Sequence, residues 1–442
     1  MTITRTGADL APGYVFMTPW PTDNEIHQSG GFIMTVDGDM IYALPINGMH
    51  DFRVQEYNES SYLTYWNGLN APFPQVGKGY GQVTFADTSY SNFSVRPDLG
   101  INTLQQDNPQ WTGGEVDIHE AEITDGYFAE IDIATNEVLY EWRALDHIDQ
   151  IPLNSSRQPL ISIIGNGTKA NPWDWIHMNA VQLLSLSGKD YYLVDARHTF
   201  SVFLVDPTDG RLVWNFDGET GGDFGPVPER GQFRWQHDTR AFNVTEDGLE
   251  LRLFDNHNAE LFNGTDQSKA VIFHLQTPPN KGISPQLIKR IDHGSYGEPY
   301  YADSMGSYNL LPNGNEIVGW GQVATSSEYG PDGDLRWEAS FGTPGLVFSY
   351  RFYKNEWHAT PAAWDPSLVV EEGKAYVSWN GATDIEAWKV YTGISENSLQ
   401  CAGVARKKGF ETFFTVPANA SYMQVGAIQG GEEVRRTSIV QA

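Results

Sequence analysis

The sequence predicts an all-β protein: a six-bladed β-propeller with a small C-terminal β appendage. The first supporting observation is composition. Aromatic residues make up 13% of the 442 residues, and Gly (44) and Pro (24) are frequent, which is typical of short strands joined by tight turns. The second is a recurring pair of apolar runs around a polar turn, without alternating helices. Recurrent hairpins of this kind indicate closed or radially repeated β structure.

The clearest predicted hairpin spans residues 203–216, where two apolar runs flank the turn Asp-Pro-Thr-Asp-Gly. Residues 129–142 have the same layout, and in both segments an Asp precedes an aromatic residue by ten positions. The same pattern predicts looser hairpins at residues 33–42, 243–253, 310–318 and 328–337. Blades of four strands and roughly 50 to 65 residues would divide the chain into about six.

The C-terminal stretch has a different character. Residues 410–416 and 421–427 alternate apolar and polar positions, as strands with one solvent-facing side do. We therefore expect two domains: a catalytic propeller over residues 1–396 and a β-strand appendage over residues 397–442.

The charge balance excludes two classes of partner. There are 28 Lys and Arg against 56 Asp and Glu, a formal net charge of −28. Binding to a nucleic-acid backbone or an anionic membrane surface needs clustered cations. No stretch approaches the roughly 18 apolar residues that a membrane helix needs. Because Cys401 is the only cysteine, the sequence excludes a disulfide within the chain and a thiolate metal cluster.

Asn-x-Ser/Thr sequons are more frequent than composition alone would give, which favours the secretory pathway. The predicted glycosylation sites are Asn58, Asn92, Asn154, Asn166, Asn243, Asn263 and Asn419. The first residues, Met-Thr-Ile-Thr-Arg, do not form a signal peptide. We expect a secreted protein whose signal peptide has been replaced by Met1.

Histidine placement is the most informative chemical signal. His177, His198, His237 and His257 each lie where a strand meets a turn, among Arg, Asn, Asp or Trp residues. In a propeller such positions can converge on the axis from different blades. The competing interpretation is that each is a satisfied structural histidine. No His-Glu-x-x-His or comparable spacing occurs, so we expect no metal and no cofactor.

These segments supply the predicted site residues. The predicted catalytic residues, which should approach one another near the axis, are His177, Arg197, His198, His237 and Arg240. The predicted substrate-binding residues, with the tryptophans as an apolar wall, are Trp173, Trp175, Asn179, Asp238, Trp320 and His119.

The segments also resemble a known family. The resembling residues are 131–147, 174–181 (Asp-Trp-Ile-His-Met-Asn-Ala-Val), 196–199, 236–240 (Gln-His-Asp-Thr-Arg), 253–256, 311–321 and 377–383. Together they resemble the fungal arylsulfotransferase-like proteins, relatives of the bacterial arylsulfate sulfotransferases. The resemblance implies a six-bladed propeller and sulfuryl transfer through a sulfated histidine, helped by further His and Arg residues.

The family's D-x-x-H-x-N histidine matches His177, and its Q-H histidine matches His237. The bacterial F-D-N-G motif is followed by an active-site arginine, whereas here the segment from Phe254 continues to Glu260. The sulfated histidine has no clear counterpart, and His293 is the nearest match. One unit charge pair at 4 Å and an effective dielectric near 20 is worth roughly 4 kcal/mol, about three decades in rate, so an acid in place of the arginine disfavours sulfuryl transfer.

These considerations leave three functions open. The first is a cofactor-free cyclisation or cycloaddition on an aromatic, phenol- or tropolone-like or terpenoid substrate in the central pocket. This interpretation follows a resemblance to hetero-Diels–Alderases of tropolone-sesquiterpenoid biosynthesis, and such a reaction needs geometry and a donor to an oxygen rather than a nucleophile. The alternatives are an arylsulfate sulfotransferase and a lectin-like binding propeller. The sequence leaves the oligomeric state open.

Overall fold

The computed structural model describes residues 1–21, 29–70, 79–96, 115–116, 121–160, 165–168, 171–257 and 266–442. Within these ranges the chain forms β-strands and single-turn 3-10 helices, and no α-helix. The predicted all-β class is therefore confirmed. Among the described residues, no helix has the length and apolar character needed to cross a membrane.

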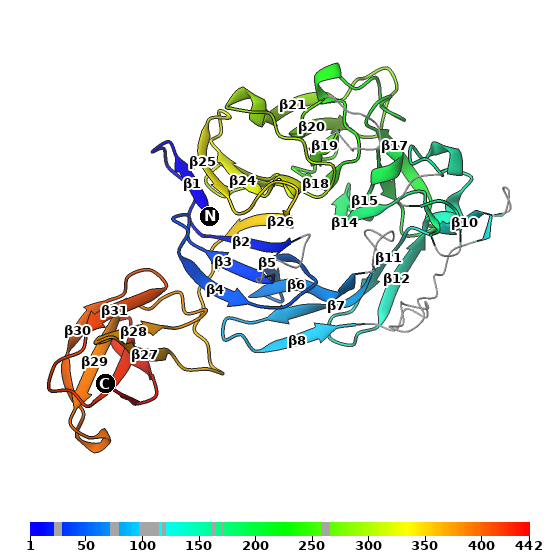
Figure 1. Cartoon of the computed structure of the whole chain (residues 1–442). Helices are drawn as coiled ribbons and strands as arrows, with labels where there is room; N and C mark the ends of the chain where they lie inside the picture. The colour runs from blue at the N-terminus through cyan, green and yellow to red at the C-terminus, as the bar shows by residue number, and fades with distance from the viewer. Residues whose placement is uncertain are drawn as a thin grey trace.

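Successive sheets, antiparallel except for the parallel pair of β10 and β13, are arranged around a common centre (Figure 1). The first contains β2 (Tyr14–Pro21), β3 (Gly31–Met34), β4 (Met40–Leu44) and β26 (Val347–Asn355). The second contains β5 (Met49–Tyr57), β6 (Ser60–Asn70), β7 (Gly79–Ala86) and β8 (Asn92–Val95). Next come β9 (Glu115–Val116), β10 (Ala121–Thr124) and β13 (Trp173–Asp174), with the hairpin β11 (Tyr127–Ile131) and β12 (Val138–Arg143).

Three further sheets complete this arrangement. One contains β14 (Met178–Leu186), β15 (Lys189–Ala196), β16 (Ser201–Val205) and β17 (Leu212–Asp217). The next contains β18 (His237–Phe242), β19 (Gly248–Asp255), β20 (Lys269–Gln276) and β21 (Gln286–Asp292). The last contains β22 (Ser307–Leu310), β23 (Glu316–Gly319), β24 (Thr325–Tyr329), β25 (Leu335–Ser340) and β1 (Thr2–Arg5).

Strands from the two ends of this arrangement pair with each other. β2 pairs with β26 from Tyr14 opposite Asn355 to Pro21 opposite Val347, and β1 pairs with β25. Strand β14 also contacts β18, β22 contacts β26, and β26 contacts β5, so neighbouring sheets meet through their first strands. Pairing across the chain ends protects sheet edges that would otherwise be open.

The predicted hairpins are present in the structure. The segment 203–216 forms β16 and β17, and 129–142 forms β11 and β12. The Asp at the start of each turn has a local role: Asp206 accepts a hydrogen bond from the Thr208 N–H, and Asp132 accepts from the N–H groups of Ala134 and Thr135. An Asp side chain that binds the backbone two or three residues later stabilises the turn.

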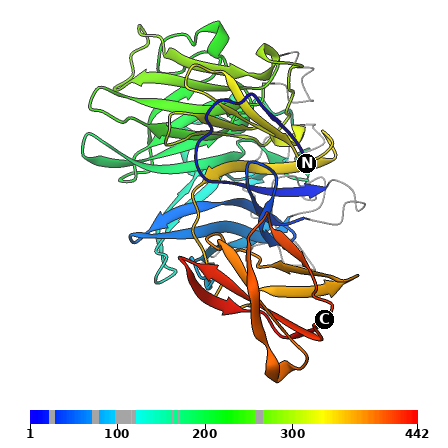
Figure 2. The same ribbon diagram turned by 90° about the vertical axis from the view of Figure 1, so that its left-hand side faces the viewer.

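The C-terminal strands pair only among themselves within the described residues. They are β27 (Ser367–Glu371), β28 (Lys374–Ser378), β29 (Ala387–Gly393), β30 (Gln400–Arg406), β31 (Glu411–Thr415), β32 (Tyr422–Gln429), β33 (Glu432–Arg436) and β34 (Val440–Gln441). They lie beside the larger arrangement (Figure 2). The predicted boundary after residue 396 falls between β29 and β30, which pair with each other, so the group of strands begins at Ser367 instead.

Candidate functional site

One group of predicted residues converges where β13 turns into β14. The backbone N–H of Arg197 donates to the His177 carbonyl at 3.0 Å, and the N–H of His198 donates to the Ile176 carbonyl at 3.0 Å. These bonds join the β13–β14 turn to the 3-10 turn η3 (Arg197–Thr199) that follows β15. The ring centroids of His177 and His198 lie 4.8 Å apart. The structure therefore brings His177, Arg197 and His198 together.

Asp174 orients His177. The Nδ1 atom of His177 lies 2.6 Å from Oδ2 of Asp174, which is only 6% exposed. A carboxylate only accepts hydrogen bonds, so Nδ1 carries the proton and Nε2 presents its lone pair. The described residues form no hydrogen bond to Nε2, and the side chain is 21% exposed. This pair has the arrangement of a base or nucleophile held in one tautomer by an acid.

His198 supports Arg197. Its Nε2 accepts a hydrogen bond from Nη1 of Arg197 at 2.8 Å, and its Nδ1–H donates to the Asp174 carbonyl at 2.5 Å. The side chain is 1% exposed, and this burial is the main cause that lowers the pKa of His198 well below its usual value. His198 is therefore a neutral acceptor that positions the guanidinium.

Arg197 is a buried cation that forms no direct ion pair among the described residues, while the charges of Asp174 and Asp303 raise its pKa against the larger effect of burial. Its Nη2 donates to the Asp303 carbonyl at 3.0 Å, and its guanidinium lies 4.9 Å from the ring centroid of Trp235. Its Nε atom is buried and forms no hydrogen bond within the described chain. Burial lowers the pKa of Arg197 to about 10, so the group stays charged at neutral pH.

His237 uses both of its nitrogens. Nδ1–H donates to Oδ1 of Asn256 at 2.6 Å, and Nε2 accepts from the N–H of Met305 at 3.2 Å. Burial, followed by the positive charges of Arg197 and Arg351, lowers the pKa of His237 well below its usual value. The geometry thus assigns His237 to holding the segment before β22, and neither nitrogen is available to a substrate.

Arg240 belongs to a second group, centred on Asp238. The Asp238 carboxylate lies 3.2 Å from Nη1 of Arg252 and 3.8 Å from both Nη2 of Arg240 and Nε of Arg351. Its Oδ2 also accepts from the Tyr308 N–H at 3.0 Å. Asp238 is 1% exposed, so its single charge is directed to these cations and offsets part of their positive charge.

Arg351 was not among the predicted residues. It is 4% exposed and donates to the carbonyls of Gly306 and Asn179. Asn179 in turn donates to the Gln236 carbonyl at 2.8 Å. Arg351 and Asn179 thus tie the first strands of different sheets together. The signal that could have revealed Arg351 is an arginine between two aromatic residues in a predicted strand.

The structure does not bring the predicted tryptophan wall together. Trp320 is 0% exposed, packs against Phe254 and Tyr300, and donates to Oγ of Ser327 at 2.9 Å. Trp175 is also 0% exposed. Trp173 is half-buried and donates to the Gln158 carbonyl at 3.1 Å. Two of the three are therefore core residues; large apolar cores bury Trp as readily as binding sites do. His119 and Glu260 lie outside the described residues.

A different set of rings lies near His237. His50 stacks on Trp66 with centroids 5.4 Å apart and contacts Trp20 edge-on at 4.6 Å. Tyr350 lies between His50 and His237, with ring-centroid distances of 5.8 Å to His50 and 6.3 Å to His237. All four are half-buried and come from β2, β5, β6 and β26. We name Trp20, His50, Trp66 and Tyr350 the aromatic group.

The predicted absence of a metal can be examined through the donor set. One ligand atom each from Asp174, His177 and His198 lies within 4.8 Å of the others. However, both His198 nitrogens are already hydrogen-bonded, one of them to a guanidinium. A divalent cation would have to break these bonds and sit beside Arg197, so these residues do not fit a metal site.

The described sequon asparagines lie at exposed positions, as glycan attachment requires. They are Asn58, Asn92, Asn154, Asn166, Asn243 and Asn419. Asn263 lies outside the described residues.

Comparison with known proteins identifies one family. The family described as Arylsulfotransferase (ASST) matches residues 100–342, more than half of the chain. No curated protein matches.

Several solved structures show distant likeness. A protein of unknown function from Bacteroides caccae is 11% identical, with 77% of this chain and 98% of that chain covered and a TM-score of 0.39. A mutant of the GH43 protein BlXynB from Bacillus licheniformis is 10% identical, with 99% and 91% covered and a TM-score of 0.25. The GH32 β-fructofuranosidase BmSUC1 from Bombyx mori is 8% identical, with 90% and 87% covered and a TM-score of 0.28. These likenesses are too weak to carry an argument.

Proposed function

Because the chain belongs to the arylsulfotransferase family, we propose that it transfers a sulfuryl group between phenolic oxygens, with Nε2 of His177 as the nucleophile. The observation that carries the proposal is the buried cation Arg197, which is bonded directly to neutral groups and lies beside the Asp174–His177 pair. A sulfate ester brings negative charge to the reacting centre, and preplaced donors there supply most of the catalysis. The family match therefore backs sulfuryl transfer better than cyclisation.

The proposed reaction has two balanced steps. In the first, the Nε2 lone pair of His177 attacks sulfur, an N–S bond forms, and the S–O bond to the donor phenol breaks to release a phenolate. In the second, the oxygen of an acceptor phenol attacks sulfur, the N–S bond breaks, and the phenolic proton passes to solvent or to Nε2. Asp174 stabilises the positive imidazole ring that exists between the two steps.

Arg197 would bind the sulfuryl oxygens, with His198 as its positioning residue. Since His198 is neutral and accepts from Nη1, it fixes the guanidinium without cancelling its charge. Removing one well-aimed donor to a developing oxyanion costs about 10²–10³ in rate.

The aromatic group would hold the phenyl rings of donor and acceptor. Half-buried rings that already contact one another at 4.6–5.8 Å leave faces on which another ring can stack or pack edge-on. Tyr350 connects this group with His237. The expected substrate is therefore a small aromatic molecule, which agrees with the family name.

Two wider expectations form part of the proposal. The sheet order and the pairing of β26 with β2 support six blades around one axis, with the site at its centre. The exposed sequon asparagines support passage through the secretory pathway.

Cofactor-free cyclisation is the second candidate, and one observation favours it. All nitrogens of His198 and His237 are hydrogen-bonded within the protein, so the described site offers few free groups besides rings, His177 and Arg197. A cycloaddition needs no nucleophile, since holding two partners in a near-attack geometry supplies up to roughly 7–11 kcal/mol in ideal cases.

Mass spectrometry of the intact protein distinguishes the two functions. The protein is incubated with 4-nitrophenyl sulfate alone, without an acceptor. Sulfuryl transfer predicts a mass gain of one sulfuryl group, located on His177 by peptide mapping and absent in His177→Ala.

The matched control is His358→Ala, because His358 forms the same kind of pair with Asp384 at 2.9 Å but is 76% exposed. This variant should gain the group as the wild type does. An adduct on another residue would overturn the assignment of His177. No adduct and no phenol release would leave cyclisation as the better proposal.

A further inference from the structure

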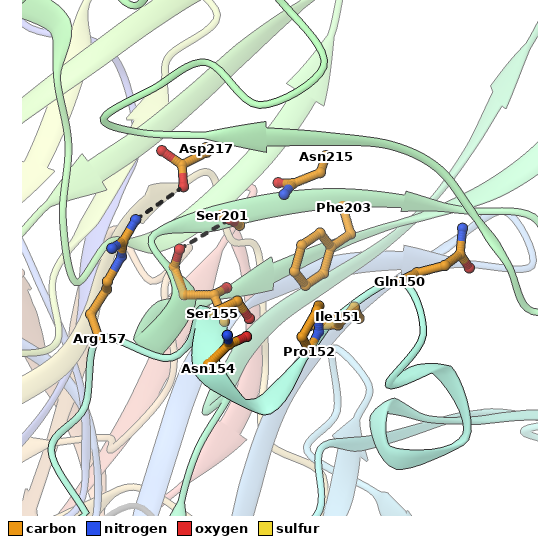
Figure 3. A pocket seen from close by; sticks show the side chains of 11 residues that line it. Gln150, Ile151, Pro152, Asn154, Ser155, Arg157, Ser201, Phe203, Asn215 and Asp217 are labelled. Atoms are coloured by element: carbon orange, nitrogen blue, oxygen red, sulfur yellow. Dashed lines mark hydrogen bonds and ion pairs between the residues drawn. The ribbon is translucent and has the colours of Figure 1, made fainter.

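A partly open cavity lies next to η3. Its volume is about 230 Å³, and it is lined by residues of the loop 150–157 and of β16 and β17 (Figure 3). Thr199 of η3 lines it, whereas Arg197 and His198 of the same turn face the Asp174–His177 pair. The cavity is therefore next to the candidate site and distinct from it.

Two residues that line the cavity carry polar atoms without partners. Oδ1 of Asn215 and Oγ of Ser155 are buried and form no hydrogen bond with the part of the chain that the structure describes. The Arg157 guanidinium lies 3.8 Å from Asp217 and 3.7 Å from Glu219, too far for hydrogen bonds. Buried polar atoms left unpaired cost about 1–3 kcal/mol each, so a polar occupant toward which these side chains turned would recover part of that cost.

The size and the lining define the chemistry of this occupant. A water molecule takes about 30 Å³ of liquid volume, so the space admits a ring-sized molecule. Phe203 and Pro152 contribute apolar surface, while Asn154, Ser155 and Asn215 contribute polar groups on either side (Figure 3). An N-acetylated pyranose fits this combination, because it has an apolar C–H face and a rim of hydroxyl groups with one amide.

Asn154 identifies the source of the sugar. It lines the cavity, it is exposed, and it begins the sequon Asn-Ser-Ser. We propose that the cavity holds the first N-acetylglucosamine of an N-glycan carried by Asn154. The donor is the lipid-linked oligosaccharide of the secretory pathway: Nδ2 loses a proton and bonds to C1 of the sugar as the lipid diphosphate leaves. The proposal rests on the secretory route proposed above and is independent of sulfuryl transfer.

The sugar would support the neighbouring site. The N–H of Arg157 donates to the His198 carbonyl at 2.7 Å, and the Arg157 guanidinium lies 5.9 Å from the ring centroid of Phe200. The loop that carries Asn154 is thereby attached to η3. A sugar packed under this loop orders the turn that positions Arg197.

The test is the accessibility of each glycan in the folded protein. The chain is secreted from a eukaryotic host and treated with peptide N-glycosidase, which cuts the bond between Asn and the first sugar, before and after denaturation. Site occupancy is read by peptide mass. In the folded protein, release at Asn154 should be at least about tenfold slower than at Asn243 and Asn419, equivalent to a local opening free energy above about 1.4 kcal/mol. After denaturation all three should be released.

Two kinds of variant sharpen the test. Asn215→Leu keeps the sequon but replaces the unpaired acceptor by a bulkier apolar group, so Asn154 should lose its protection. Ser156→Ala leaves every lining residue unchanged but removes the glycan, together with the acceptor of the Gln158 N–H. Its unfolding temperature should therefore fall further below that of the wild type when both proteins are glycosylated than when both are made without glycans. The absence of a glycan at Asn154, or release from the folded protein at the rate of Asn419, would overturn the proposal.

Discussion

Replacing Asp174 by Asn tests the central pair of the proposed site with little change in shape. Asp174 is 6% exposed, and its Oδ2 lies 2.6 Å from Nδ1 of His177. The substitution removes the negative charge. It also allows the amide to donate to Nδ1, which would move the histidine proton to Nε2. That proton would occupy the lone pair that attacks sulfur, so the first step should slow.

The magnitude follows from the contact. A hydrogen bond to a charged group contributes about 1.5–3 kcal/mol, and a unit charge pair about 4 Å apart at an effective dielectric near 20 contributes about 4 kcal/mol. If the loss of this stabilisation raises the free energy of the transition state, formation of the sulfohistidine should slow by between about tenfold and a thousandfold. Binding of the donor should change much less, because Asp174 does not contact it in the proposed geometry.

The assay is single-turnover release of 4-nitrophenolate from 4-nitrophenyl sulfate, followed with the sulfohistidine mass. Asp384→Asn is the control, since it breaks the exposed pair with His358 and should leave the rate unchanged. Circular dichroism shows whether the variant is folded. A folded Asp174→Asn protein that releases phenolate at the wild-type rate would refute the role of the pair.

Three further results are expected. Lys354→Met should lower the free energy of unfolding in urea by about 3–5 kcal/mol, because Lys354 and Glu328 pair at 0% side-chain exposure and the carboxylate would stay buried without its partner. Adding Glu328→Gln should restore much of the lost stability. Trp66→Ala should raise KM for an acceptor phenol about tenfold with little change in kcat, as loss of a stacking face implies, whereas Trp320→Phe should leave KM unchanged. Burial lowers the pKa of His198 in the folded protein. The free energy that neutral His198 contributes to folding is therefore complete above about pH 6.5 and falls as the pH decreases, by up to about 1.4 kcal/mol per pH unit. In urea unfolding below pH 6.5, the stability of His198→Asn should depend less steeply on pH than that of the wild type.

The hairpins could be predicted because their signals are local. The turn after Asp206 is stabilised by its own side chain, and the apolar runs on either side need only each other. The boundary of the C-terminal strands could not be predicted in the same way. Strand β29 resembles any other strand in sequence, and only its pairing with β30 and β32 assigns it to the C-terminal group. A strand's partner is a non-local property.

Part of the site could be predicted for a similar reason. His177 and His198 meet because β14 and β15 form a hairpin, with Met178 opposite Ala196. The state of His237 was not predictable, since its partner Met305 lies in a different sheet connection. The aromatic group was missed because each ring comes from a separate strand without a motif, and a Trp in a core, such as Trp320, has the same sequence signal as a Trp in a binding site.

The unequal pairing of the buried arginines favours an anionic substrate. Arg240, Arg252 and Arg351 share the carboxylate of Asp238, whereas Arg197 is bonded to a neutral imidazole and a carbonyl. A buried cation that forms no direct ion pair is costly. The charges of Asp174 and Asp303 offset part of this cost, and an anion bound beside Arg197 would offset more of it. Inorganic sulfate should therefore stabilise the folded wild type by about 1.4 kcal/mol at ten times its dissociation constant. Arg197→Gln, which can still donate to His198, should lose this gain and keep only the general salting effect of sulfate. An equal sulfate-induced rise in unfolding temperature in both proteins would show that Arg197 binds no anion.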